Sequence, residues 1–153
     1  MLGIYTEKGV GMNDPFNLNR FRDAQAAVID TVMAELRAGY KKSHWMWFVF
    51  PQLAVLGHSA TAKHYGIADL EEARAYLADP ILGPRLIACA TCMLAIEGNS
   101  LSGILGSPDD LKFVSCMTLF GVADPRQPVF QACLDKYCDG AMDQVTTNYL
   151  GPK

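Results

Sequence analysis

The segment from Trp45 to Pro51 constrains the fold of this chain more than any other. It contains both tryptophans, and six of its seven residues are large and apolar. Such a continuous apolar run is compatible with either a buried strand or a helix, because periodicity does not separate the two. No second segment of comparable strength is present to pair with it, and a lone strand cannot satisfy its backbone hydrogen bonds. We therefore expect a helix or buried turn that Pro51 ends.

Capping signals divide the remaining chain into further helices. A first long helix is expected from about Asp14 to Ala38, with Asp14 as its cap and Pro15 in its first turn. A second clear boundary is Ser107-Pro108, where a capping serine and a proline precede the helix. Other starts and stops are marked by Gly39, Ser59, Gly66, Asp69, Asp79-Pro80, Gly98, Gly121, Asp124-Pro125, Gly140 and Asp143. The prediction is an all-α fold of seven or eight helices, arranged like an orthogonal bundle.

Length and composition indicate one domain with its own core. The chain has 153 residues, of which 50% are hydrophobic and 19% charged, and about this many residues form a single domain. A chain of this size buries roughly 68–70% of its unfolded surface, so a core needs no disulfide or metal. We expect residues 13–153 to form the helical domain and residues 1–12 to be a flexible extension.

The charge pattern argues against two classes of partner. The formal net charge is -3 and the basic residues are scattered, whereas nucleic-acid binding needs a clustered basic face. No apolar run approaches the roughly 20 residues of a membrane span, and the N-terminus lacks the pattern of a secretory signal. The expectation is a cytoplasmic protein, monomeric or a small homo-oligomer, without nucleic-acid or membrane partners.

The five cysteines are expected to be core residues. An odd number in a cytoplasmic chain argues against a disulfide framework. The closest pair, Cys89 and Cys92, lies inside an apolar helical run, whereas a redox pair needs an exposed helix N-terminus. A zinc site would need a second ligand pair at suitable spacing. We predict no metal and no cofactor, with a redox or metal role for these thiols as the less favoured alternative.

Motifs across the chain resemble a known family. The segment from Lys41 to Gln52 and the following Leu56-Gly57-x-Ser59 resemble the family catalogued as domain of unknown function 1810. The resemblance continues through Tyr65-x-Ile67, Glu72-Ala73-x-Ala75-Tyr76-Leu77, Pro80-x-Leu82-Gly83-x-Arg85-Leu86, Asp109-x-x-Lys112, Ser115-x-Met117-Thr118-Leu119-Phe120 and Asp139-Gly140-x-x-Asp143. It covers roughly residues 16 to 150 and implies a compact, mainly helical domain without implying an activity.

A weaker similarity is to the NADAR family, which processes ADP-ribose-linked and NAD-derived compounds. His64-Tyr65, Gly83-x-Arg85 and Ser107-x-Asp109 follow the order of that family's motifs. The chain departs from the pattern because Lys63 replaces the glutamate before His-Tyr. The later catalytic-type glutamate also has no clear counterpart.

His44 is the best candidate for a catalytic base. Two lysines precede it, and nearby positive charge keeps an imidazole neutral, so that it can accept a proton. The alternative is a structural histidine that binds a backbone carbonyl beside a packed tryptophan.

Candidate ligand-binding residues flank the same aromatic segment. Trp45 can stack on a flat ligand, although core packing is its commoner use, and Gln52 can both donate and accept at the rim. A lysine early in a helix, such as Lys112, suits a compensating anion, either Asp109 or a ligand. The remaining candidate ligand-binding residues are Lys41, His58, Ser59, Tyr65 and Thr118. Each of these residues also has an ordinary structural explanation, such as a solvated lysine or a helix cap.

These residues support two hypotheses. The first is a domain that binds a small anionic molecule, which is nucleotide-like or ADP-ribose-like. If the domain also hydrolyses this molecule, His44 is the candidate base. The second is a non-enzymatic interaction or scaffold domain whose aromatic segment is purely structural. The hypotheses differ in whether His44, Gln52 and Lys112 converge on one concave pocket.

Overall fold

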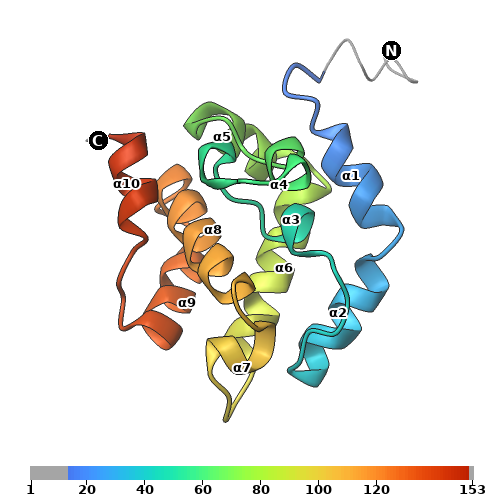
Figure 1. Ribbon diagram of the computed structural model, residues 1–153, viewed down its shortest axis with the longest axis vertical. Coiled ribbons are helices and arrows are strands. Elements are labelled where there is room, and N and C mark those ends of the chain that lie inside the picture. The colour runs from blue at the N-terminus through green and yellow to red at the C-terminus, as the bar shows by residue number, and fades with distance from the viewer. Residues whose placement is uncertain (1–13, 152–153) are drawn as a thin grey trace.

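The computed structural model describes residues 14–151, which form a mainly helical fold (Figure 1). This part of the chain contains ten α-helices and one short 3-10 helix, and no strand beyond one isolated bridge between Leu53 and Ile67. The α-helices are α1 (Asn19–Ala26), α2 (Ile29–Ala38), α3 (Met46–Val49), α4 (Ala60–His64), α5 (Leu70–Ala78), α6 (Leu82–Ala95), α7 (Leu101–Leu105), α8 (Asp109–Ala123), α9 (Pro128–Cys138) and α10 (Gln144–Leu150). The 3-10 helix, η2, is Ala54–Leu56. The predicted all-α class is confirmed.

Helices α6, α8 and α9 build the centre of the molecule. Helix α8 packs against α5, α7, α9 and α10, and α6 packs against α2, α5 and α9. Figure 1 shows α1 and α2 along one side and α10 on the opposite side. Helices α5 and α6 are bent by 90° at their junction. No described helix is by itself long and apolar enough to cross a membrane, although this bent pair reaches that length and composition.

The predicted long helix from Asp14 to Ala38 is wrong in two places. It begins only at Asn19, because Asn17 has a φ of 53° in a preceding turn. It also breaks between α1 and α2, where Val28 has a φ of -130° and a ψ of -3°. Just before the break, Gln25 is 2% exposed and donates to the Phe48 carbonyl at 2.7 Å. This tertiary contact fixes the direction of α1, and β-branched residues at the break weaken helix continuation.

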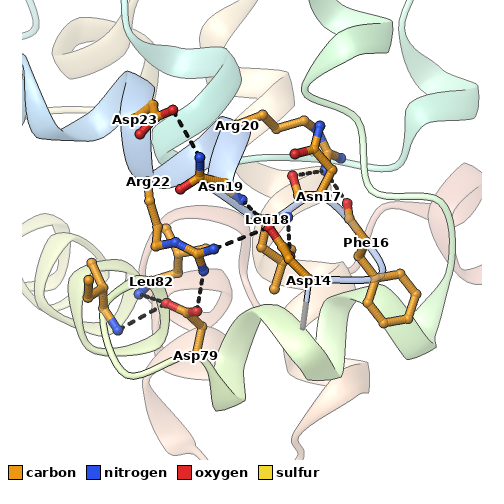
Figure 2. A network of polar contacts seen from close by, with 11 residues as sticks. Asp14, Phe16, Asn17, Leu18, Asn19, Arg20, Arg22, Asp23, Asp79 and Leu82 are labelled. Atoms are coloured by element: carbon orange, nitrogen blue, oxygen red, sulfur yellow. Dashed lines mark hydrogen bonds and ion pairs between the residues drawn. The ribbon is translucent and has the colours of Figure 1, made fainter. Parts of the chain in front are cut away.

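Figure 2 shows how the turn before α1 is held in place. The Asp14 carboxylate accepts hydrogen bonds from the backbone N–H groups of Leu18 at 2.7 Å and Asn19 at 2.9 Å. Arg22 joins Asp14 to Asp79, with N–O distances of 3.2 and 2.5 Å. Asp79 in turn accepts from the Leu82 N–H, at the start of α6. Asp14 was predicted to cap the helix, but it instead caps the tight turn before α1, whose N-cap residue is Leu18.

The boundary at Ser107-Pro108 also differs from the prediction. Helix α8 begins at Asp109, and the N–H groups of Leu111 and Lys112 donate to the Pro108 carbonyl at 3.0 and 3.2 Å. Pro108 rather than Ser107 is therefore the N-cap residue. The short helix α7, capped by Ser100, was not predicted. This helix and the break between α1 and α2 explain why residues 14–151 contain ten α-helices instead of the predicted seven or eight.

The aromatic segment forms one short helix and a buried turn, as predicted. Helix α3 covers Met46–Val49, and Trp45 and Phe50 on either side of it are each 1% exposed. Phe50 packs edge-to-face on Phe113 of α8, with ring centroids 5.0 Å apart. The segment is thus part of the central core. The extension expected at residues 1–12 lies outside the described residues.

Candidate functional site

The main cavity of about 410 Å³ lies between the η2–α4 segment and helices α8 and α10. Its volume falls in the range of sites for small organic ligands, roughly 300–1,000 Å³. The lining residues are Gln52, Leu56, Gly57, His58, Ser59, Ala62, Pro108, Leu111, Lys112, Ser115, Asp143 and Val145. Polar side chains from three separate parts of the chain therefore face one space with partly apolar walls.

The first wall is positioned by two backbone contacts and a cap. The Gln52 carbonyl accepts a hydrogen bond from the Ile67 N–H at 2.9 Å, and Ile67 in turn binds the Ala54 N–H at 2.8 Å. Ser59 caps α4, because its Oγ accepts from the Ala62 N–H at 3.0 Å. The Ser59 hydroxyl proton remains available to a ligand, since the hydroxyl acts there only as an acceptor.

Helix α8 supplies the second wall and the only cation among the lining residues. Lys112 and Ser115 are three residues apart and therefore share a helix face. Lys112 Nζ lies 3.8 Å from Asp109 and 5.4 Å from the centre of the Trp47 ring. Asp109 has a closer partner in Lys41, at 2.9 Å. The ammonium of Lys112 is thus held loosely, at a distance where a ligand anion can compete.

Helix α10 supplies the third wall through its cap, Asp143. One Asp143 oxygen accepts from the N–H of Thr146 at 3.0 Å and from its hydroxyl. The Asp143 N–H donates to Thr118 Oγ1 at 2.9 Å, and Thr118 is fully buried. Thr118 therefore positions this wall from behind and does not line the cavity.

A second, much smaller cavity adjoins the first. It has a volume of about 10 Å³, enough for about one water molecule. It is lined by Met46, Trp47, Phe50, Gln52, Ala62, Tyr65 and Lys112. Gln52, Ala62 and Lys112 border both spaces. The aromatic segment thus meets the main cavity through these three residues.

Gln52 is the most informative side chain of the site. It is half-buried and borders both cavities, yet its amide makes no hydrogen bond to any residue within 14–151. In contrast, no buried side-chain nitrogen or oxygen atom in residues 14–151 lacks a hydrogen-bond partner. Arg20, for example, donates to four backbone carbonyls and to Glu72. An amide without a protein partner at the edge of a cavity is suited to bind a ligand.

Comparison with known proteins agrees with the resemblance seen in the motifs. The model of the family described as protein of unknown function (DUF1810) matches residues 15–150. The chain belongs to the DUF1810 family. A solved structure similar to this DUF1810 protein is that of the conserved hypothetical protein Rv1873 from Mycobacterium tuberculosis. The two chains are 51% identical with a TM-score of 0.90, over 92% of this chain and 100% of that one. A search of curated proteins gives no match.

The DUF1810 structure brings together some of the predicted site residues. Gln52, His58, Ser59 and Lys112 line the main cavity, and Tyr65 lies at the small one. Three others are buried elsewhere: Lys41 in its ion pair with Asp109, Trp45 in the core, and Thr118 between α8 and α10. His44 is exposed on the loop before α3 and borders neither of these cavities.

A residue that sequence reasoning missed is Glu35 on α2. Its carboxylate accepts hydrogen bonds from the N–H groups of Lys42 and Ser43, from the Ser43 hydroxyl and from the Trp45 indole, at 2.6–3.2 Å. Burial alone would raise the pKa of Glu35, but these four donors together lower it from 4.5 to about 2. Nothing in the sequence distinguishes Glu35 from an ordinary glutamate on the polar face of a helix.

Burial raises the thiol pKa of four of the five cysteines, which are Cys89, Cys116, Cys133 and Cys138. Cys89 is buried within α6, and burial raises its pKa to about 12, so that it remains a thiol at neutral pH. Cys92 is half-buried on the same helix. No group of three or more His, Cys, Asp or Glu residues that could hold a metal ion occurs in residues 14–151.

Proposed function

We propose that this protein binds a small organic anion in the main cavity, with Lys112 pairing with the negative group. The observation that carries the proposal is the half-buried residue Gln52, whose side-chain amide has no protein partner in residues 14–151 and which lies beside the loosely held Lys112. A ligand that accepts from both would satisfy the amide and compete with Asp109 for the ammonium. Charge-assisted hydrogen bonds of this kind are the strong ones in binding sites.

The polar groups of the cavity support binding more directly than hydrolysis. The Asp143 carboxylate is already engaged as the cap of α10, and His44 lies outside the cavity. His58 borders the cavity but is exposed and has no carboxylate hydrogen-bonded to it within residues 14–151. A general base needs to be within hydrogen-bond reach of its proton and is usually oriented by a third group. Nucleotide-like and ADP-ribose-like molecules remain candidate ligands.

The alternative of a purely structural aromatic segment has support of its own. Trp45 is 1% exposed and its indole N–H is satisfied by Glu35 at 2.9 Å. This tryptophan is therefore a core residue, and it does not face the main cavity. An interaction or scaffold domain explains this half of the segment, but it leaves the convergence of Gln52 and Lys112 without a purpose.

The test is a thermal-shift screen with AMP, ADP, ADP-ribose, NAD and small carboxylates. A ligand at 100 times its dissociation constant stabilises a protein by about 2.7 kcal/mol, which raises the melting temperature of a chain of this size by about 5–10 °C. Hits should lose their effect in Lys112→Gln and in Gln52→Leu. They should keep it in His44→Gln, because His44 lies outside the cavity. Hits that persist in both cavity variants, or no hit at all, would contradict the proposal.

A further inference from the structure

Two strongly exposed aliphatic side chains line the main cavity. Leu111 on α8 is 64% exposed and Val145 on α10 is 58% exposed. The half-buried Leu56 and Ala62, from the η2–α4 segment, extend this apolar lining on another wall of the cavity. Covering apolar surface is favourable in proportion to the area removed from water. The cavity is therefore suited to a ligand with an apolar body as well as an anionic group.

The charges around the cavity limit the ligand to about one negative charge. Lys112 is the one cationic side chain among the lining residues, and Asp143 is a carboxylate in the same lining. Asp109, which also belongs to α8, lies 3.8 Å from the Lys112 ammonium. A molecule with two or more negative charges would bring the additional charge toward these carboxylates, and like charges at short range repel. One negative charge is balanced by Lys112 alone.

We propose that the ligand is an amphipathic monoanion, that is, a compact apolar body carrying a single carboxylate or sulfonate. This inference rests on the proposed function and specifies the class of its ligand. The acid group pairs with Lys112 and accepts from the Gln52 amide and the Ser59 hydroxyl. The apolar body covers Leu111 and Val145. The small cavity beside Trp47 holds no part of this body, because its 10 Å³ takes about one water molecule.

The experiment uses 1-anilinonaphthalene-8-sulfonate, a fluorescent amphipathic monoanion, as the reporter and unlabelled competitors to define the class. Octanoate should displace the dye, and octanol and octylamine should need at least about tenfold higher concentrations, equivalent to about 1.4 kcal/mol. ADP and ADP-ribose should displace it more weakly than octanoate does. Each titration is repeated by isothermal calorimetry with octanoate alone, so that the conclusion does not depend on the dye.

Matched variants assign the binding to the cavity. Lys112→Gln should weaken octanoate at least about tenfold, and Lys112→Met provides a second variant that keeps the length of the side chain. Lys63→Gln removes the same charge from an exposed position on α4 that does not line the cavity and should bind as the wild type does. Leu111→Ser combined with Val145→Ser should weaken octanoate and leave the melting temperature within about 2 °C, because both residues are exposed.

The outcomes separate this inference from the proposed function. If ADP or ADP-ribose binds in a Lys112-dependent way and octanoate does not, the anion site stands and the ligand class is wrong. If octylamine competes as well as octanoate, the charge argument is wrong. If no probe depends on Lys112, both proposals fail.

Discussion

Replacing Glu35 with glutamine tests whether a single carboxylate holds the loop before the aromatic segment. The substitution keeps the shape of the side chain and removes its charge. The four donors around Glu35 lower its pKa from 4.5 to about 2. A change of one unit in pKa between the folded and unfolded states corresponds to about 1.4 kcal/mol of folding free energy. The upper limit is therefore about 3.4 kcal/mol of folding free energy. Water screens a carboxylate that is only partly buried, so we expect about half of this, about 2 kcal/mol.

The pH dependence has a defined sign. Because the pKa is lower in the folded state, the contribution of Glu35 is complete above pH 4.5 and is lost as the pH falls toward 2. The difference between wild type and Glu35→Gln should therefore shrink from about 2 kcal/mol at pH 7 to about 1 kcal/mol at pH 3. The difference shrinks because the Glu35 carboxyl becomes protonated in the unfolded chain at pH 3, whereas it stays mostly ionised in the folded protein.

The assay is thermal unfolding followed by circular dichroism at both pH values. For a chain of this size the expected loss at pH 7 lowers the melting temperature by about 4–8 °C. Glu97→Gln is the matched control, because Glu97 is exposed on the loop after α6 and accepts no hydrogen bond within residues 14–151. Equal melting temperatures for Glu35→Gln and wild type at pH 7, or a difference that grows as the pH falls, would refute the reasoning.

Two further predictions concern buried residues that the fold depends on. Trp45→Ala should cost about 3–5 kcal/mol in urea unfolding, because the side chain is fully enclosed; a loss below about 1 kcal/mol would show that the core closes over the gap. Arg20→Met should cost about 3–5 kcal/mol, because Glu72, whose side chain is 5% exposed, would lose its buried counter-ion at 2.8 Å. The control is Arg74→Met, at an exposed position on the same helix as Glu72, and it should change stability by less than about 0.5 kcal/mol.

Features determined by local chemistry were predictable from the sequence. Ser59, Asp69 and Asp143 cap helices as expected, each through a bond to an N–H three residues later. The all-α class followed from an aromatic segment without a strand to pair with. These predictions succeed because a cap or an unpaired strand depends only on a few neighbouring residues.

Features that depend on tertiary contacts were not predictable in the same way. The break after α1 coincides with the contact of Gln25 with Phe48 on α3, 23 residues away. The hydrogen bonds to Glu35 form because the loop that lies seven to ten residues further along the chain folds back over α2. The cavity was only partly foreseen: Gln52 and Lys112 do converge, whereas His44 does not join them. Sequence spacing alone cannot show which side of α3 each flanking residue occupies.

The polar residues before and after the aromatic segment therefore have different roles. Asp109 links the two regions, because it contacts both Lys41 and Lys112. On the N-terminal flank, Lys41 is buried and binds Asp109 at 2.9 Å, while Glu35 holds the loop that follows. On the C-terminal flank, Gln52 faces the cavity beside Lys112.

A carboxylate that already has one close cation attracts a second cation less strongly, since the negative charge of the carboxylate is largely neutralised. By occupying Asp109, Lys41 keeps the Lys112 ammonium only loosely paired and thus available to an anion in the cavity. The N-terminal flank in this way supports the proposed anion site, although none of its own side chains line the cavity.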